Sequence, residues 1–166
     1  MPSRALTELL RGQGAHADPI ACIEDLPADL ATRQVAGFPH SIAQLVFHMN
    51  YWMDYDLRRV RNEKPPYPAH NSESFPAKAE LASAEWKEWQ ERFATLLNHA
   101  AEFADSNRAE LDRQVEATHP SHQQRASTLE AVLWQLVAHN SYHIGQIAMI
   151  RRMLGAWPPR GGGDTW

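Results

Sequence analysis

The chain has 166 residues and carries 16 lysines and arginines against 20 aspartates and glutamates, which gives a formal net charge of −4. This length is enough to bury a substantial core, so we expect one domain over residues 1–166. The mild acidity excludes the basic footprint of nucleic-acid and anionic-membrane binding, and no apolar run approaches the roughly 18 residues of a membrane span.

The residues from 1 to 33 predict an irregular helical unit. Residues 3–11 have helical periodicity, and a second short helix begins after Pro19 and is interrupted at Pro27. Cys22 is the single cysteine, which excludes an intrachain disulfide and suits a reducing compartment. The N-terminus lacks the uniform apolar segment of a signal peptide, so we expect a cytoplasmic protein. We interpret Cys22 as a packing residue rather than a nucleophile.

Ser41 is expected to begin a long helix over residues 42–62. Ser41 and Gln44 have the spacing of a capping box. Apolar and aromatic residues then recur at helical intervals until Lys64-Pro65-Pro66-Tyr67-Pro68, which cannot continue a helix.

A third helical segment is predicted over residues 83–106, where Trp86 and Trp89 begin a series of apolar residues at helical spacing. Long loops flank it, over residues 63–82 and 106–126. Loops of about twenty residues in a compact domain are functional or disordered. We expect the loop of residues 63–82 to border the functional site, with Pro65, Pro66, Tyr67 and Phe75 as a stiff, partly apolar wall.

The last helix is predicted over residues 127–154. Ser127 and Glu130 have capping-box spacing, and Gly155 is a suitable C-terminal cap before the tail of residues 155–166. Strand-type alternation is nearly absent from the whole chain. We therefore predict an all-α fold in which four helical units pack around one core, as in a four-helix bundle.

Two histidines of this last helix, His139 and His143, are four residues apart within its apolar periodicity. Such a pair leaves the same helix face, with Cβ atoms roughly 5–6 Å apart. His48 occupies an apolar position of the helix over residues 42–62. Two imidazoles from one helix and one from a facing helix are typical of an open metal site.

A single histidine on an apolar face is more often a hydrogen-bonded core residue than a metal ligand. Three buried imidazoles without a metal, however, would each need a separate polar partner, whereas one divalent cation satisfies all three. The remaining histidines are interpreted as solvated or capping residues; they are His16, His40, His70, His99, His119 and His122.

The segment His143-Ile144-Gly145-Gln146-Ile147 follows His139, and His48 follows a Pro-His-Ser-Ile turn. This ordered set, with the proline-rich loop and the tryptophan-bearing helix, resembles the DinB/YfiT-like superfamily of metalloproteins. The resemblance implies a four-helix bundle with one divalent metal ion per chain, held by His48, His139 and His143. It also implies a cytoplasmic location and a two-fold homodimer. Zinc is the first expectation for such a nitrogen-rich site, with nickel, iron or manganese as alternatives.

Characterised members of this superfamily include transferases that use bacillithiol, mycothiol or glutathione, and a mycothiol-dependent maleylpyruvate isomerase. The resemblance therefore implies a metal-dependent transferase whose partners are a low-molecular-weight thiol and an electrophilic substrate. Ile144 is a departure, because such motifs frequently carry arginine at that position.

The residues alone leave the reaction open. Three neutral imidazoles leave a divalent ion its full charge, so either a bound thiol or a bound water becomes acidic. A hydrolase is therefore an alternative, as is a non-catalytic site closed by a carboxylate from Asp54, Asp56 or Glu73. Polar neighbours that can orient an imidazole or contact substrate are Tyr51, Tyr55, Gln135, Asn140 and Gln146.

Overall fold

The computed structural model describes residues 4–76, 81–118 and 127–161, and the elements in these ranges are almost all helical. They are α1 Arg4–Leu10, α2 Ala21–Glu24, α3 Ala28–Ala31, α4 Ile42–Val60, the 3-10 helix η1 Asn71–Ser74, α5 Ser83–Ala104, α6 Arg108–Leu111, β1 Gln114–Val115, β2 Ser127–Thr128 and α7 Leu129–Met153. The predicted all-α class is confirmed, and none of the described helices is both long and apolar enough to cross a membrane.

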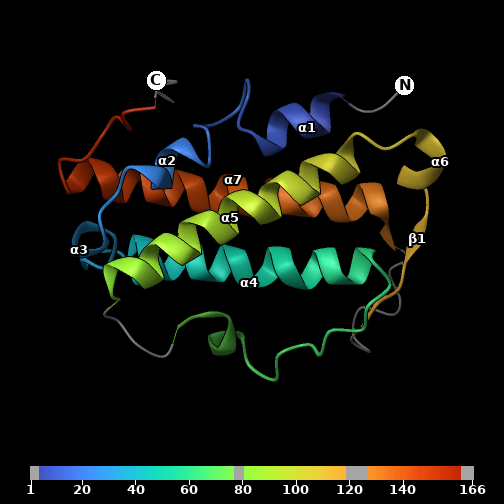
Figure 1. The fold of residues 1–166 in the computed structure, drawn as a ribbon, viewed down its shortest axis with the longest axis horizontal. Helices are drawn as coiled ribbons and strands as arrows, with labels where there is room; N and C mark the ends of the chain where they lie inside the picture. The colour runs from blue at the N-terminus through green and yellow to red at the C-terminus, as the bar shows by residue number, and fades with distance from the viewer. Residues whose placement is uncertain (1–3, 77–80, 119–126, 162–166) are drawn as a thin grey trace.

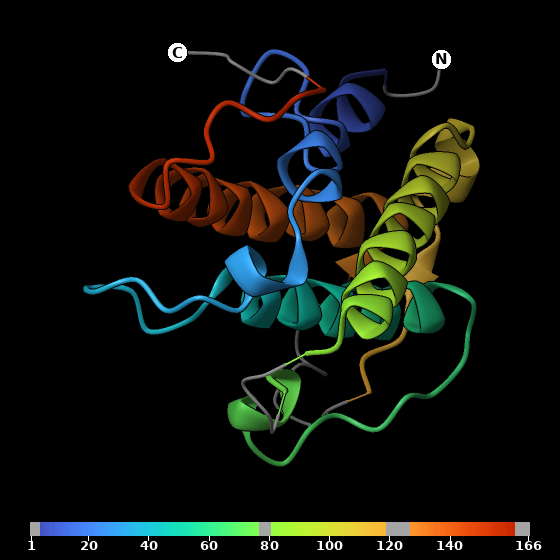
Figure 2. The same cartoon turned by 60° about the vertical axis from the view of Figure 1, so that its left-hand side comes forward.

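Helices α4 and α7 lie side by side and run in opposite directions, and α5 crosses them (Figures 1 and 2). Helix α1 packs against α5 and α7 on the side away from α4. The expected bundle of four helical units is therefore present, with the N-terminal unit broken into α1, α2 and α3. Large side chains with less than 2% exposure fill its centre, among them Met49, Met53, Phe93, Leu97 and Leu129.

Helix α4 begins where the sequence predicts and ends at Val60, two residues before the predicted end. The Ser41 hydroxyl accepts from the Gln44 backbone N–H, and the Gln44 side chain accepts from the Ser41 backbone N–H, which completes the predicted capping box. At the other end, Asn62 adopts a left-handed conformation with φ 62°, and its N–H donates to the Arg59 carbonyl.

The predicted start of the last helix at Ser127 is wrong by two residues. Ser127 and Thr128 form β2 and pair antiparallel with β1, so the helix begins at Leu129 and Thr128 is its N-cap, accepting from the Ala131 N–H. Strand pairing holds Ser127 in an extended backbone that a helical residue cannot adopt. Gly155 ends the helix as predicted, in a left-handed conformation with φ 70°.

The loop predicted over residues 106–126 contains α6 and β1 in its described part, while His119 and His122 lie outside the described residues. In its described part up to residue 76, the loop of residues 63–82 runs along α4 and contains η1 (Figure 1). Residues 77–80 of that loop and residues 162–166 of the predicted tail also lie outside the described ranges.

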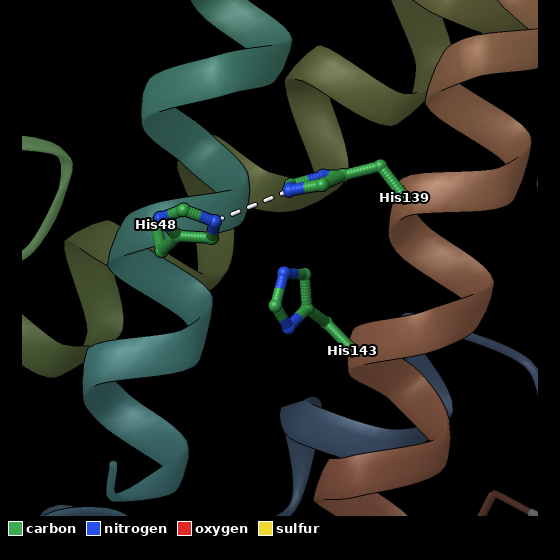
Figure 3. Close-up of side chains that lie close together, drawn as sticks. All are labelled: His48, His139 and His143. Atoms are coloured by element: carbon green, nitrogen blue, oxygen red, sulfur yellow. Dashed lines mark hydrogen bonds between the residues drawn. The ribbon is translucent and has the colours of Figure 1, made fainter. Parts of the chain in front are cut away.

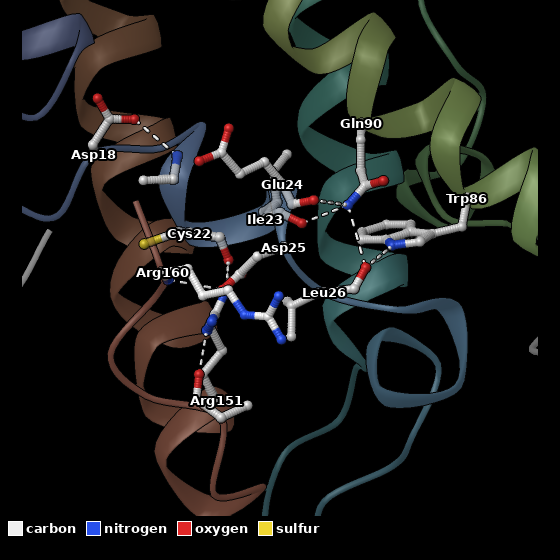
Figure 4. A network of polar contacts seen from close by, with 12 residues as sticks. Asp18, Cys22, Ile23, Glu24, Asp25, Leu26, Trp86, Gln90, Arg151 and Arg160 are labelled. Carbon is white, nitrogen blue, oxygen red and sulfur yellow. Dashed lines mark hydrogen bonds and ion pairs between the residues drawn. The ribbon is translucent and has the colours of Figure 1, made fainter. Parts of the chain in front are cut away.

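A buried arginine joins the end of α7 to the N-terminal unit (Figure 4). Arg151 is 2% exposed, and its Nη1 donates to the Cys22 carbonyl at 2.7 Å and to Asp25 Oδ1 at 2.8 Å. Its Nε donates to the Ala156 carbonyl. Burial alone raises the pKa of Asp25, but the hydrogen bonds from Arg151 and the Arg160 N–H outweigh it and hold that pKa below its ordinary value.

Helix α5 also binds the N-terminal unit, through the backbone carbonyls of residues 23 and 26. Trp86 Nε1 donates to the Leu26 carbonyl at 2.7 Å, and Gln90 Nε2 donates to the Ile23 carbonyl at 2.5 Å (Figure 4). The short helices of the N-terminal unit are therefore fixed by side chains from α5 and α7 that bond to their backbone carbonyls, as buried carbonyls require.

Candidate metal centre

The three predicted metal ligands come together between α4 and α7. His48 projects from α4 toward His139 and His143 on α7 (Figure 3), and one ring nitrogen of each lies within 4.8 Å of the others. The Nε2 atoms of His48 and His139 are 3.2 Å apart. The four-residue spacing on α7 stacks its two rings edge to face, with centroids 4.6 Å apart.

These separations suit a single divalent ion. Two nitrogens bound to a tetrahedral zinc ion at 2.0–2.1 Å lie about 3.3 Å from each other. The 3.2 Å between the His48 and His139 nitrogens is close to that value. Small rotations of the His143 ring can bring the third nitrogen to the same distance, because the three atoms already lie within 4.8 Å.

A hydrogen bond on its outer side fixes the tautomer of His48. The Ser74 hydroxyl donates its one hydrogen to the Asn71 carbonyl at 2.6 Å, so its oxygen must accept from His48 Nδ1 at 2.9 Å. Nδ1 of His48 therefore carries the proton, and Nε2 presents a lone pair toward the other two histidines. This outer contact is the arrangement that metal-ligating histidines usually have.

His143 is oriented in the same way by the next turn of its own helix. Its Nδ1 donates to Gln146 Oε1 at 2.7 Å, which leaves Nε2 unprotonated. His139 differs, because its Nδ1 is buried and has no hydrogen-bond partner among the described residues. A buried ring nitrogen without a partner costs free energy, so the cluster is incompletely satisfied within the described chain.

Burial keeps the three imidazoles neutral. Desolvation, with the neighbouring His143 and His139 adding to it, lowers the pKa of His48 to about 3. Desolvation together with the nearby His143 lowers the pKa of His139 to about 4. The pKa of His143 is also lowered, mainly by burial. At neutral pH all three rings are therefore in the protonation state that a metal requires of its ligands.

A cavity of about 380 Å³ lies beside His139, between α4 and α7. Gln135 and Tyr55, two of the predicted neighbours, line it. The Tyr55 hydroxyl also hydrogen-bonds to the Thr118 hydroxyl. The remaining lining residues are Trp52, Asp56, Arg59, Tyr67, Ser127 and Leu136.

Two other predicted neighbours, Tyr51 and Asn140, do not line this cavity. Tyr51 lines a larger hollow of about 680 Å³ between α4, α5 and the Pro65-Pro66 turn, and no histidine of the cluster lines that hollow. The Nδ2 of Asn140 donates to the Met53 sulfur at 3.3 Å, inside the core. Of these two cavities, the smaller one has a histidine of the cluster, His139, in its wall.

None of the three acidic residues considered as a fourth ligand joins the cluster. Within the described ranges the histidines group without a carboxylate. Asp54 pairs with Arg92 at 3.2 Å, Asp56 pairs with Arg59 at 2.8 Å, and Glu73 accepts from the His70 backbone N–H. These partners hold the carboxylates elsewhere, so the arrangement of the three histidines corresponds to an open site rather than a closed one.

Two residues of the loop over residues 63–82 contact the cluster, and one of them, Ser74, was missed in the sequence. Besides Ser74, Phe75 stacks on the His48 ring with centroids 4.3 Å apart. His40, interpreted as solvated, stacks on Phe75 at 4.1 Å. This loop therefore borders the site as expected. Ser74 belongs to no periodic pattern, whereas Phe75 was expected as part of the loop's apolar wall, although its stacking on His48 was not.

Comparisons with known proteins agree with this fold. A family model described as the DinB superfamily matches residues 15–147. A solved structure, described as a conserved protein of locus from Enterococcus faecalis, is similar with a TM-score of 0.66 and 15% sequence identity, over 92% of this chain and 97% of the other. That likeness concerns the fold alone. No match was found among curated proteins.

Proposed function

Since this chain belongs to the DinB superfamily, we propose that it is a metal-dependent enzyme whose single divalent ion is held by His48, His139 and His143. The observation that carries the proposal is the convergence of three neutral imidazoles, of which His48 and His143 are turned inward by outer hydrogen bonds. Zinc suits this donor set best, with nickel, iron or manganese as replacements.

The proposed reaction is transfer of a low-molecular-weight thiol to an electrophile. Held by three neutral imidazoles, the cation keeps its full charge and makes a thiol beside it acidic at neutral pH. Ser74 and Gln146 hold the His48 and His143 rings in position. Burial lowers the pKa of both rings and so keeps them neutral. The superfamily resemblance supports a thiol of the bacillithiol, mycothiol or glutathione type over water.

The cavity beside His139 is the proposed place for the thiol. Its wall carries the buried ion pair of Asp56 and Arg59, whose charged atoms are 2.8 Å apart. These two residues follow Trp52 along α4 by about 6 Å and about 10 Å. This pair presents a carboxylate next to a guanidinium, which complements a group with both an ammonium and a carboxylate. The glutamyl end of glutathione is such a group. Trp52 and Tyr67 supply apolar walls for the remainder of the molecule.

The test combines metal analysis of untagged protein with a panel of thiols and a test electrophile. We expect one divalent ion per chain and thiol transfer that is lost in His139→Ala and kept in His99→Ala, a histidine of α5 that contacts Arg61 and not the cluster. In cobalt-loaded protein, added thiol should give a charge-transfer band in the near ultraviolet.

The outcomes separate the alternatives. Metal-free protein that cannot be loaded with zinc, nickel or cobalt would overturn the site itself. Hydrolysis of esters or amides without thiol, lost with the metal, would replace the transferase by a hydrolase. A loaded site that excludes thiols and catalyses neither reaction would leave a non-catalytic metal-binding protein.

A further inference from the structure

The hollow of about 680 Å³ between α4, α5 and the Pro65-Pro66 turn, here called the α4–α5 hollow, has none of the three histidines in its wall. Four aromatic residues line it, three from α4 and one from α5. The rings of Phe47 and Trp89 lie against each other with centroids 4.9 Å apart. A cavity of this size with an apolar wall is typical of a site for a small organic molecule. The four aromatic residues are Phe47, Tyr51, Tyr55 and Trp89.

A buried amide with an unused acceptor also lines the hollow. Asn50 is 4% exposed, and its Nδ2 donates to the Trp89 backbone carbonyl at 3.0 Å. A carbonyl can only accept, so this contact fixes the amide with its nitrogen toward Trp89. The Asn50 Oδ1 atom has no hydrogen-bond partner among the described residues. Buried acceptors without a partner are rare in folded proteins, so this oxygen points to a hydrogen-bond donor on a molecule that the hollow binds.

The charged residues of the hollow favour a cation over an anion. Both arginines that line it are paired with carboxylates. Arg92 lies 3.2 Å from Asp54, and Arg58 lies 2.8 Å from Glu63. Glu88 lines the same hollow from an exposed position of α5 and forms no ion pair within the described ranges. An anion would therefore have to displace a carboxylate from an arginine, whereas a cation would meet a carboxylate that is not yet paired.

We propose that the α4–α5 hollow binds an organic ammonium ion, a protonated primary or secondary amine attached to an apolar body. Aromatic faces attract such a cation. Its N–H groups donate to Asn50 Oδ1, and Glu88 supplies the opposite charge. The apolar body lies against the aromatic rings and the two prolines. Alkylamines carry the required proton at neutral pH, as the side chain of lysine does.

This site goes beyond the proposed function and does not depend on a metal ion. Within the described ranges it shares Tyr55 with the cavity beside His139, and it shares no residue with the three-histidine cluster. Amine binding should therefore persist in protein treated with a chelator and in His139→Ala, although both lack the metal.

Titration calorimetry with three matched ligands tests the charge. Phenethylamine is the probe, phenethyl alcohol replaces its ammonium by a neutral hydroxyl, and phenylpropionate replaces it by an anion. The amine should bind at least about tenfold more tightly than either control, because hydrogen bonds and contacts of a charged group are the stronger ones. Equal affinities for the amine and the alcohol, no binding of the amine at millimolar concentration, or binding that is lost with the metal would each overturn the proposal.

A variant of Asn50 tests the hydrogen bond. Asn50→Leu removes the acceptor at similar volume and should weaken binding of phenethylamine about 2- to 10-fold. The trimethylammonium form of the probe keeps the charge but has no N–H, so its affinity should be the same in this variant and in the natural protein. Equal losses for the two ligands would show that Asn50 acts only through the structure, and would overturn its role as the acceptor.

A variant at the edge of the hollow tests the site without disturbing the core. Glu88→Gln removes the unpaired carboxylate and should weaken binding of both cations by up to about fivefold. Glu102→Gln changes an exposed glutamate of the same helix that does not line the hollow, and it should leave both affinities unchanged. Affinities that are unchanged in Glu88→Gln and in Asn50→Leu would place the amine elsewhere and overturn the proposal.

Discussion

The Nε2 atoms of His48 and His139 lie 3.2 Å apart, although 91 residues separate them in the sequence. The contact exists because α4 and α7 pack side by side, and each carries a histidine at a position where its apolar stripe meets the other helix. Without a metal ion, two nitrogens at this distance either share one proton or direct their lone pairs at each other. A divalent ion between the two nitrogens removes their repulsion and uses both lone pairs.

Removing the Ser74 hydroxyl should weaken metal binding without removing a ligand. Ser74→Ala leaves His48 Nδ1 without the oxygen that orients the ring, and losses of this kind cost about 10- to 100-fold in metal affinity. Ser72→Ala, an exposed serine of the same 3-10 helix, is the matched control. Competition with a chromogenic chelator measures both affinities. Equal affinities for Ser74→Ala and the natural protein would show that the hydrogen bond does not position the ring.

The ligands of this site could be predicted because helical spacing is a local property. His139 and His143 share a face in any helix, and His48 lies at an apolar position of its own amphipathic helix. The capping box at Ser41 and the cap at Gly155 were predicted for the same reason, since each depends on fewer than six consecutive residues.

Some neighbours of the ligands could be predicted from helical spacing, as Gln146 was, but those that depend on packing between distant segments could not. The Ser74 hydrogen bond and the Phe75 stacking on His48 come from a loop whose path over α4 is set by contacts formed only in the folded chain. Ser127 looked like a helix cap, but its pairing with Val115 converted it into a strand. Tyr51 and Tyr55 are close in the sequence, yet only Tyr55 lines the cavity beside His139.

Removing the metal should leave the bundle folded. The core is built from apolar side chains of α1, α4, α5 and α7, and it does not include the three histidines. Far-ultraviolet circular dichroism should therefore keep its helical signal in excess chelator, with a lower melting temperature because a bound ligand stabilises the native state. Loss of the helical signal on chelation would identify a structural metal instead.

The metal-free protein should lose stability as the pH falls below about 6.5. The unfolded imidazoles of His48 and His139 take up protons near their ordinary pKa of 6.5, whereas in the folded state their pKa values are about 3 and about 4. The unfolded state therefore binds more protons in this window, and protonation favours unfolding. Urea midpoints between pH 7 and 5 measure the effect. The double variant His48→Gln, His139→Gln should show a flatter profile, and an equally steep one would assign the dependence to other groups.

Arg151 should contribute strongly to stability. Arg151→Met removes the charge that pairs with Asp25 and the donor to the Cys22 carbonyl inside the protein. Breaking a buried pair from one side typically costs about 3–5 kcal/mol. Arg33→Met breaks an exposed pair with Asp29 and should cost at most about 1 kcal/mol. Urea denaturation gives both values, and similar losses for the two variants would show that burial adds nothing to the Arg151 pair.

Cys22 should be unreactive in the folded protein. A test of this cysteine therefore distinguishes an added thiol from a thiol of the chain as the nucleophile. Its side chain is fully buried, and burial raises the pKa of its thiol to about 12. At neutral pH almost no thiolate is therefore present, and no reagent can reach it. Ellman's reagent should react with one thiol per chain in urea and with none in buffer. Cys22→Ser should then keep any thiol-dependent transfer at the natural rate, because the nucleophile comes from the added thiol. Rapid labelling in buffer, or transfer lost with Cys22→Ser and kept with His139→Ala, would make the cysteine the nucleophile and the three histidines bystanders.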